Sequence, residues 1–454
     1  MKERLHHLLI LTLGIGIAAA SLPRSLPAQT AGVKKFDLKT AREYAVEHSY
    51  DTRKSQLDLE TAHQKLKETV ASGLPQISAN INYNNNLKLA TSLIPNFFEG
   101  KLEEKIPVRF GTQHNATANI QVQQLIFNGS YFVGLQTSKL YQSLAEQSVE
   151  RTSLNVQEDV TTSYYLILVA EENERILQLT LANLEKTHAE VLEMNKEGFV
   201  AETDADLIQI ALTELKNGLQ TLQKQKDMAA KLLKFQMGLD LDEPIALVDT
   251  LEDILRQTDV DLSLQSEFEI ENNIDYRLIS GQEKLTEMAL KNEKSRYLPT
   301  VSAFFTYQQN AFRDRFSFFS SGGRWFPMQV LGVNISIPVF KSGNQSAKVS
   351  QASLAVDRAR NDREQVTQAL LLEAEQTKIR LSSTQENYSN MKSNLKLSQK
   401  VYEAMLTKYK EGVASSMELT QANDKSLKSQ FDYFQALSEL LNAKNKMDRL
   451  TNNY

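Results

Sequence analysis

The stretch from Gly343 to Gly412 opens with GNQSAKVSQASLAVDRARND and closes with AMLTKYKEG, and it decides the fold of this chain. No Gly or Pro lies between the two glycines, and residues that favour helix (Leu, Ala, Gln, Lys, Glu and Arg) dominate the stretch. Residues that fit a coiled-coil seam recur at every seventh position: Leu381, Tyr388, Leu395, Tyr402 and Tyr409. Such a helix would extend about 100 Å, far more than a compact domain needs. The stretch therefore predicts a rod whose function depends on what its two ends contact.

The composition of the chain excludes several classes of protein. Its 454 residues carry a net charge of −5, which gives no basic surface for nucleic acid. The absence of Cys excludes disulfides, thiolate metal sites and a lipid-bearing N-terminal Cys. The six His are scattered without a pair at metal-binding spacing, and neither a phosphate loop nor a nucleophile elbow is present. We therefore expect no enzyme activity, no cofactor, no metal site and no nucleic-acid partner.

The first residues, 1–28, have the pattern of a secretory signal peptide. Lys2 and Arg4 precede an apolar run, residues 8–20, which has the length of a signal-peptide core and is too short for a transmembrane helix. Cleavage would follow Ala20 or Ala28. No later segment is apolar for long enough to cross a bilayer as a helix. We therefore expect a secreted or outer-membrane protein.

Four short segments alternate between apolar and polar residues with a period of two, which is typical of strands. In the first segment Ile77 and Ile81 alternate with Ser78, Asn80 and Asn82. A long, polar, Asn-rich loop is expected between the first segment and the second. The predicted strands cover residues 76–84, 116–124, 300–308 and 330–338.

The chain contains an internal duplication. Leu74-Pro75 ends a helical pattern before the first strand, and it recurs as Leu298-Pro299 before the third strand, about 220 residues later. The tripeptide Lys-Glu-Gly that ends at Gly198 recurs at Gly412 after the second long helical pattern. We therefore divide the chain into a first repeat (29–239), a linker (240–266) and a second repeat (267–454). Predicted helices cover 130–196 and 203–237 in the first repeat, and 343–410 and 415–450 in the second.

The alternating strands have two interpretations. One is the face of a soluble sandwich, and the other is a wall between lipid and water, as in outer-membrane barrels. We prefer the second because the strands form only two distant hairpins, each flanked by very long helices, and because a secretory signal precedes them. Four strands cannot close a barrel, and open strand edges are not tolerated in hydrocarbon. Other copies of the chain must therefore complete the sheet.

These motifs resemble the TolC family of outer-membrane efflux proteins over essentially the whole chain after the signal peptide. The resemblance rests on the duplicated helix, Leu-Pro and strand joints and on two turn motifs, NKEGFVAETD at 195–204 and YKEGVASSME at 409–418. It implies a mainly α-helical fold with a small antiparallel β part. It also implies a homotrimer, in which four strands per copy close a 12-stranded barrel and the long helices continue it as a periplasmic coiled-coil tunnel. The linker 240–266 would lie in a belt around the middle of the tunnel.

The resemblance also assigns roles to residues at the far ends of the long helices. It implies that the two turns contact a periplasmic adaptor through Gly198, Phe199, Val200, Ala201, Gly412, Val413, Ala414 and Ser415. It implies a gate that is built from Asp204, Tyr409, Glu418 and Gln421, although the family has a second carboxylate where this chain has Gln421. Two interpretations of Asp204 stay open. Asp204 either bonds to Tyr409 of the next coil or, with Thr203, caps the start of its own helix.

The function that these expectations favour is a passive exit duct of a tripartite efflux or secretion system. Its partners would be two further copies of the chain, a periplasmic adaptor, an inner-membrane pump and outer-membrane lipid. Its cargo would be small molecules or polypeptides. The first alternative is a periplasmic coiled-coil adaptor or scaffold without a membrane barrel, and the second is a helical enzyme or surface-binding protein. The two hairpins with one apolar and one polar face favour the duct.

Overall fold

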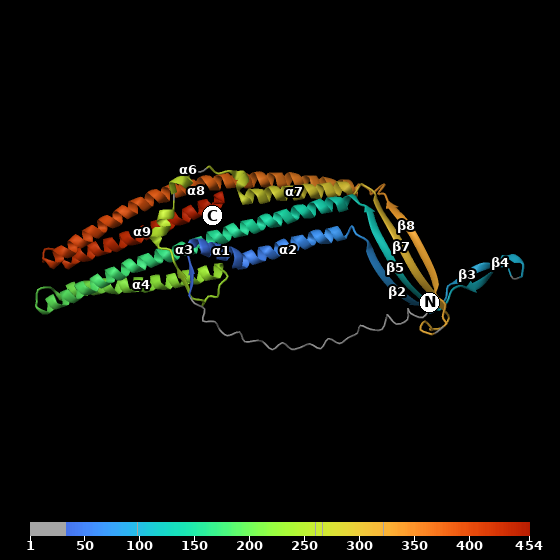
Figure 1. The fold of residues 1–454 in the computed structure, drawn as a ribbon, viewed down its shortest axis with the longest axis horizontal. Coiled ribbons are helices and arrows are strands. Elements are labelled where there is room, and N and C mark those ends of the chain that lie inside the picture. The colour runs from blue at the N-terminus through green and yellow to red at the C-terminus, as the bar shows by residue number, and fades with distance from the viewer. Residues whose placement is uncertain (1–32, 98, 259, 266, 321) are drawn as a thin grey trace, which may run out of the picture.

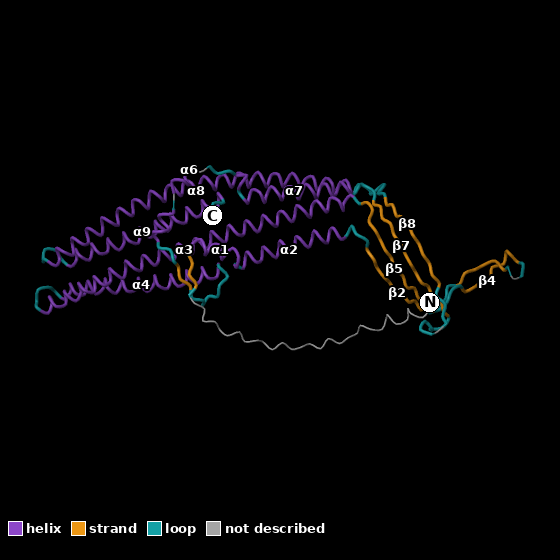
Figure 2. Tube along the Cα trace, in the orientation of Figure 1, coloured by secondary structure: helices purple, strands orange, loops and turns teal. Residues whose placement is uncertain are grey.

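A computed structural model describes residues 33–97, 99–258, 260–265, 267–320 and 322–454 of the chain. The expected signal peptide, residues 1–28, lies outside the described residues. The described part of the chain is strongly elongated, with a sheet toward one end and two helical hairpins at the other (Figures 1 and 2).

Two very long helices form the rod. α3 (Gly129–Lys196) and α8 (Asn344–Lys410) have 68 and 67 residues, and both run from the sheet to the opposite end of the molecule (Figure 1). Shorter helices pack against them, so that each long helix has one partner on the sheet side and another on the far side. These partners are α2 (Tyr50–Ala71) and α4 (Glu202–Gln236) for α3, and α7 (Ile274–Ser295) and α9 (Ser416–Thr451) for α8. The mainly α-helical fold that the sequence predicts is confirmed.

The chain bends at Ser49, between α1 (Leu38–His48) and α2. Ser49 lies in the extended region of the backbone and follows the last residue of α1. Its hydroxyl accepts a hydrogen bond from the backbone N–H of Thr52 at 3.2 Å and thereby caps α2. The same residue therefore ends one helix and starts the next.

The predicted small antiparallel sheet is also confirmed. It contains four strands in the order β2–β5–β7–β8, with each strand antiparallel to its neighbour. The strands are β2 (Gln76–Asn85), β5 (His114–Phe127), β7 (Thr300–Arg313) and β8 (Phe326–Ser336). Within the described residues, no further strand pairs with the outer edge of β2 or of β8.

The register of the strands gives the sheet one apolar and one polar face. Directly opposed residues share a face, so one row of the apolar face consists of Ile77, Val122, Phe305 and Leu331. A row of the polar face consists of Asn80, Asn119 and Gln308. The apolar face is open to the surroundings in a single copy, and the side chain of Ile81 on this face is 83% exposed.

The segment between β2 and β5 is not the loop that its Asn-rich composition predicts. It contains a second hairpin, β3 (Thr91–Asn96) and β4 (Lys101–Arg109), which projects beyond the sheet (Figure 1). Ile94 lies opposite Ile106 in this hairpin. One proline interrupts each strand, Pro95 in β3 and Pro107 in β4, and β4 also contains several charged residues. The pairing is therefore not visible as a period-two pattern.

A belt of small elements surrounds the middle of the rod. β1 (Lys34–Phe36) pairs in parallel with β6 (Ile245–Leu247), and α5 (Leu251–Gln257), α6 (Val260–Gln265) and the short 3-10 helix η1 (Ile270–Asn272) follow. Beneath the belt lies the largest hydrophobic core of the described chain, built mainly from α3, α4 and α9. Its fully buried side chains include Val160, Tyr164, Leu233, Leu437 and Leu441.

Asp249 fastens this belt to the rod. Its Oδ2 atom accepts a hydrogen bond from the backbone N–H of Leu38 at 2.7 Å and another from the buried hydroxyl of Tyr164 at 2.9 Å. The same hydroxyl lies 3.1 Å from the carbonyl oxygen of Phe36. One carboxylate thus connects the linker, the start of α1 and the middle of α3.

We expect Asp249→Ala to loosen the belt without unfolding the rod. The substitution leaves the N–H of Leu38 without its acceptor, at a cost of about 1–3 kcal/mol. The measurement is hydrogen exchange of the amides of Lys34 and Val248, which bond across the belt to Pro244 and Phe36 and should exchange faster. Asp242→Ala is the control, because this carboxylate is exposed. Equal exchange in both variants would show that Asp249 does not hold the belt.

Candidate functional site

The rod ends in two turns of identical construction. Gly198 after α3 and Gly412 after α8 have φ of +78° and +72°, in the left-handed region that favours glycine. The N–H of Phe199 bonds to the carbonyl of Met194 at 2.9 Å, and the N–H of Val413 bonds to the carbonyl of Lys408 at 2.9 Å. The N–H groups of Gly198 and Gly412 also bond, to the carbonyls of Asn195 and Tyr409 respectively, which completes a Schellman motif in each turn. Nothing lies within 4 Å of a Cβ built on either glycine, so backbone conformation rather than space requires glycine here.

Both turns expose an apolar side chain at the extreme end of the molecule. Phe199 is 77% exposed and Val413, at the equivalent position, is 74% exposed. Val200 and Ala414 follow them and pack against the core between the two hairpins. Ala201 and Ser415 are exposed and precede the next helices. The two tips therefore present the same small apolar surface twice.

The helices that leave the two turns start with different caps. Ser415 caps α9, and its hydroxyl accepts a hydrogen bond from the N–H of Glu418 at 3.3 Å. In return, the Glu418 carboxylate accepts bonds from the N–H of Ser415 at 2.8 Å and its hydroxyl at 2.9 Å. These bonds hold the pKa of Glu418 below its usual value. α4 has Ala201 at the cap position, and only Asp204 contributes, accepting from the N–H of Ala201 at 3.2 Å.

Asp204 also joins the two hairpins to each other. Its Oδ1 atom accepts a hydrogen bond from the hydroxyl of Ser416, at the first turn of α9. Within the described chain the hydroxyl of Tyr409 has no hydrogen-bond partner, so the implied bond from Asp204 to Tyr409 is not formed inside one copy. Burial and then the charge of Asp204 raise the pKa of the Tyr409 hydroxyl. Sequence reasoning missed Ser416, and its only signal was a second Ser beside the cap.

Glu418 and Gln421 lie together on the surface of α9, one turn apart, and both are exposed. In the described chain no hydrogen bond or ion pair joins Glu418 or Gln421 to Asp204 or Tyr409. The four residues of the implied gate are therefore not joined into one hydrogen-bonded network within the described part of a single copy.

The hairpin of α8 and α9 carries buried polar groups without partners near its tip. Asn423 is 2% exposed, yet neither its amide nitrogen nor its oxygen forms a hydrogen bond. It lies between Leu419 and Leu427, which pack in the core shared by the two hairpins. The hydroxyls of Tyr402 and Tyr409 are also buried and unpaired. A buried polar group that finds no partner costs about 1–3 kcal/mol, so these groups weaken the packing of the hairpin within a single copy.

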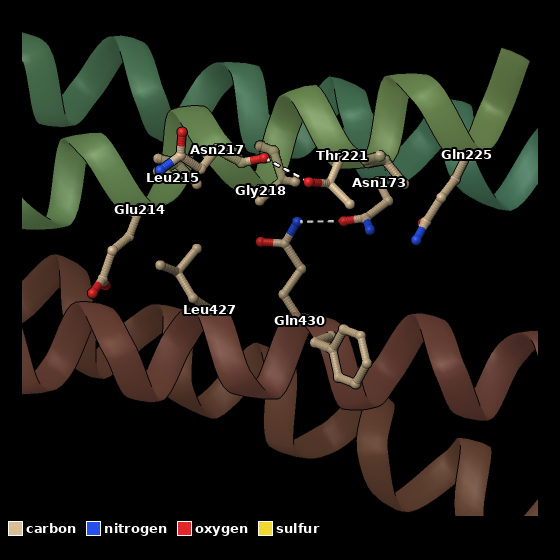
Figure 3. Close-up of a pocket in the computed structure, with 12 residues that line it drawn as sticks. Asn173, Glu214, Leu215, Asn217, Gly218, Thr221, Gln225, Leu427 and Gln430 are labelled. Atoms are coloured by element: carbon tan, nitrogen blue, oxygen red, sulfur yellow. Dashed lines mark hydrogen bonds between the residues drawn. The ribbon is translucent and has the colours of Figure 1, made fainter.

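A groove of about 510 Å³ separates the hairpins farther from the tips (Figure 3). Its walls come from α3, α4 and α9, and a hydrogen bond from Gln430 to Asn173 at 2.9 Å spans it. Gly218 lies on the α4 side, where nothing approaches within 4 Å of a Cβ built on it. The groove is therefore open enough to receive a side chain from outside.

The part of the chain that the structure describes lacks two features. No group of three or more His, Cys, Asp or Glu side chains there could hold a metal ion. No helix there combines the length and the apolar character that a membrane span requires.

Comparison with known proteins identifies the class. Residues 287–453 match the family described as Outer membrane efflux protein. No curated protein sequence matches the chain. The outer membrane protein VceC from Vibrio cholerae has a similar fold, with a TM-score of 0.70 and 14% identity over 91% of this chain and 95% of VceC.

Two further solved structures are similar along most of their length. The CmeC outer membrane channel of Campylobacter jejuni has a TM-score of 0.70 and 16% identity, over 97% of this chain and 94% of CmeC. The open state of the Neisseria gonorrhoeae MtrE outer membrane channel has a TM-score of 0.65 and 15% identity, over 91% of this chain and 88% of MtrE. The fold and the matched domain define a subunit of an outer-membrane channel. Residues 287–453 are similar to the outer membrane efflux protein family, and the described chain as a whole has the fold of the outer-membrane channels VceC and CmeC.

We expect Asn423→Leu to stabilise the tip of the α8–α9 hairpin. The substitution removes the unpaired amide from an apolar core and should lower the free energy of the packed state by about 1–3 kcal/mol. Slower hydrogen exchange of α9 amides around Leu419 and Leu427 would report the change. Gln421→Leu is the control, since Gln421 is exposed on the same helix. Faster exchange in Asn423→Leu would mean that the amide has a partner in the assembled protein.

We expect Asp204→Ala to raise the conductance of the resting channel in planar bilayers. The variant loses the hydrogen bond from Ser416, and a hydrogen bond to a charged group contributes about 1.5–3 kcal/mol. Ser416→Ala should act in the same direction, whereas Tyr409→Phe removes an unpaired hydroxyl and should change little.

Asp206→Ala is the charge-matched control, because Asp206 is exposed on the same turn. Equal conductance of Asp204→Ala, Asp206→Ala and the unmodified protein would count against a role of this contact in closing the channel.

Proposed function

We propose that this chain is one protomer of a homotrimeric exit duct that carries solutes passively across the periplasm and the outer membrane. The duct would work with a periplasmic adaptor and an inner-membrane pump, which supplies the energy, in a tripartite efflux or secretion system. The observation that carries the proposal is a sheet with one apolar face, one polar face and two free edges, joined end-on to helices of 68 and 67 residues.

The sheet supports the membrane part of the proposal. Backbone N–H and C=O groups along the free edges of β2 and β8 need partners in hydrocarbon, and closure into a barrel provides them. Three copies, each placing β2 beside β8 of the next, would close 12 strands. The row of Ile77, Phe305 and Leu331 would then face lipid, and the row of Asn80 and Gln308 would face water. A soluble scaffold, the first alternative, would leave this apolar face in water.

The helices support the periplasmic part of the proposal. At about 1.5 Å per residue, α3 and α8 span about 100 Å from the sheet to the tips. The polar sheet face and the space enclosed by three copies of the rod would form one continuous path. Nothing along this path needs to perform catalysis, because the pump would drive transport.

The tips support the docking part of the proposal. Phe199 and Val413 are exposed apolar side chains at the end of a rigid rod, a position that suits protein contact rather than packing. Val200, Ala201, Ala414 and Ser415 would complete the two contact surfaces. The groove beside Gly218 would let an adaptor helix extend its contact along the hairpins.

We expect Gly198→Val and Gly412→Val to abolish efflux while trimers still assemble. A β-branched residue at positive φ strains the turn by about 1–2 kcal/mol and displaces the apolar tip. The measurements are drug accumulation in cells and trimer content of the outer membrane. The control is Gly343→Val, because Gly343 has the same φ of +78° and the same open surroundings but lies at the sheet end of α8. Trimers of the tip variants that keep full efflux would refute docking through the tips.

A further inference from the structure

The hairpin of β3 and β4 is joined to the sheet but packs extensively against none of the other described elements. The ladder of β2 and β5 continues through a bond from Asn86 N–H to the carbonyl of Gln113 at 2.7 Å. A bond from Phe110 N–H to the carbonyl of Ala90 at 3.3 Å then leads into the hairpin. Beyond this point β3 and β4 contact mainly each other (Figures 1 and 2). An isolated two-stranded hairpin is only marginally stable in water, so this one needs a cover.

One face of the hairpin carries apolar side chains that a partner could cover. Ile94 lies opposite Ile106, and Val108 lies opposite Ser92 on the same face. The other face pairs Pro95 with Lys105, and its remaining pairs are Leu93 with Pro107 and Thr91 with Arg109. We call the face of Ile94, Ile106 and Val108 the apolar face of the hairpin.

Outer-membrane lipid is a poor cover for this face. Tyr83 and His114, whose side chains are 2.8 Å apart, lie at the outer ends of their strands together with Phe316 and Phe318. Aromatic clusters of this kind mark the boundary between membrane and water in barrels, and the hairpin begins beyond that boundary. Segment 97–110 has three acidic and three basic residues, so it carries no excess of positive charge for an anionic lipid surface.

Addition of another strand to the edge of the hairpin is also disfavoured. Pro95 in β3 and Pro107 in β4 lack the N–H that an added strand would need. Any partner must therefore pack on a face and not along an edge.

We infer that the hairpins of three copies pack through their apolar faces into a cap over the outer mouth of the duct. The inference rests on the proposed trimer. β2 has a free edge and is followed directly by the hairpin. In the trimer this edge would lie at the interface between copies, and each hairpin would therefore start at an interface. The closed barrel holds the three hairpins at high effective concentration, so a small apolar face is enough for association. The balanced charge of the segment adds no net repulsion between the copies. Such a cap narrows the outer mouth and hinders entry of large solutes.

The absence of Cys from the chain makes the test direct, because one introduced Cys can bond only to its own copy in a neighbour. Ile94→Cys places the thiol on the apolar face and Leu93→Cys places it on the opposite face of the same strand. A disulfide requires Cβ atoms about 4 Å apart, so Ile94→Cys should give on the order of tenfold more disulfide-linked dimer than Leu93→Cys. Ile106→Cys, on the apolar face of β4, repeats the test if Ile94→Cys does not fold.

The mass of the unoxidised protein in detergent separates this inference from the proposed function. A trimer whose Ile94→Cys and Ile106→Cys variants do not cross-link, or cross-link no more than Leu93→Cys, overturns the cap and leaves the duct intact. A monomer overturns both. Replacement of residues 91–109 by a short Gly-Ser turn should give several-fold faster entry of a large hydrophilic antibiotic into cells, and unchanged entry would also contradict the cap.

Discussion

Hydrogen bonding of the strand edges is the constraint on which the rest of this structure depends. A four-stranded sheet leaves β2 and β8 with rows of backbone groups that hydrocarbon cannot satisfy. In the proposed duct the apolar face of the sheet contacts lipid, and the edges would pair with other copies to give a symmetric pore. The helices inherit this arrangement, because α3 follows β5 after a single residue and α8 starts shortly after β8.

The two helical hairpins at the far end have the same backbone turn but different side-chain hydrogen bonds. Both tips use the same glycine turn, yet Asn195 in the first donates to the carbonyl of Val200 at 2.9 Å. Its counterpart in the repeat is Tyr409, which is buried without a hydrogen-bond partner in the described chain. The tip of the first hairpin thus has a side-chain hydrogen bond that the tip of the second lacks, and the second is tied to its neighbour through Asp204 and Ser416. The duplication has therefore kept the glycine turn while the side-chain contacts around it differ.

Periodicity was enough to predict the long helices and the sheet, because both place their apolar residues at regular local spacing. It also predicted that Tyr409 lies in a coiled-coil seam, and the residue is buried there. The contact from Asp204 to Ser416 could not be predicted in this way, since it joins residues 212 positions apart and depends on how two hairpins meet. The β3–β4 hairpin was missed because its pairing, Ile94 with Ile106, becomes visible only across the turn.

The uninterrupted helices α3 and α8 determine how far the tips lie from the sheet. Their lengths of 68 and 67 residues set the distance from membrane to tip, because each helical residue adds about 1.5 Å. An insertion of one or two residues would rotate the seam away from its partner helix, and only whole heptads preserve it. Both repeats must also change together, or one tip would overhang the other. A lineage whose cell envelope widens can therefore lengthen this duct only in steps of about 10 Å, by adding one heptad to each helix of both helical hairpins.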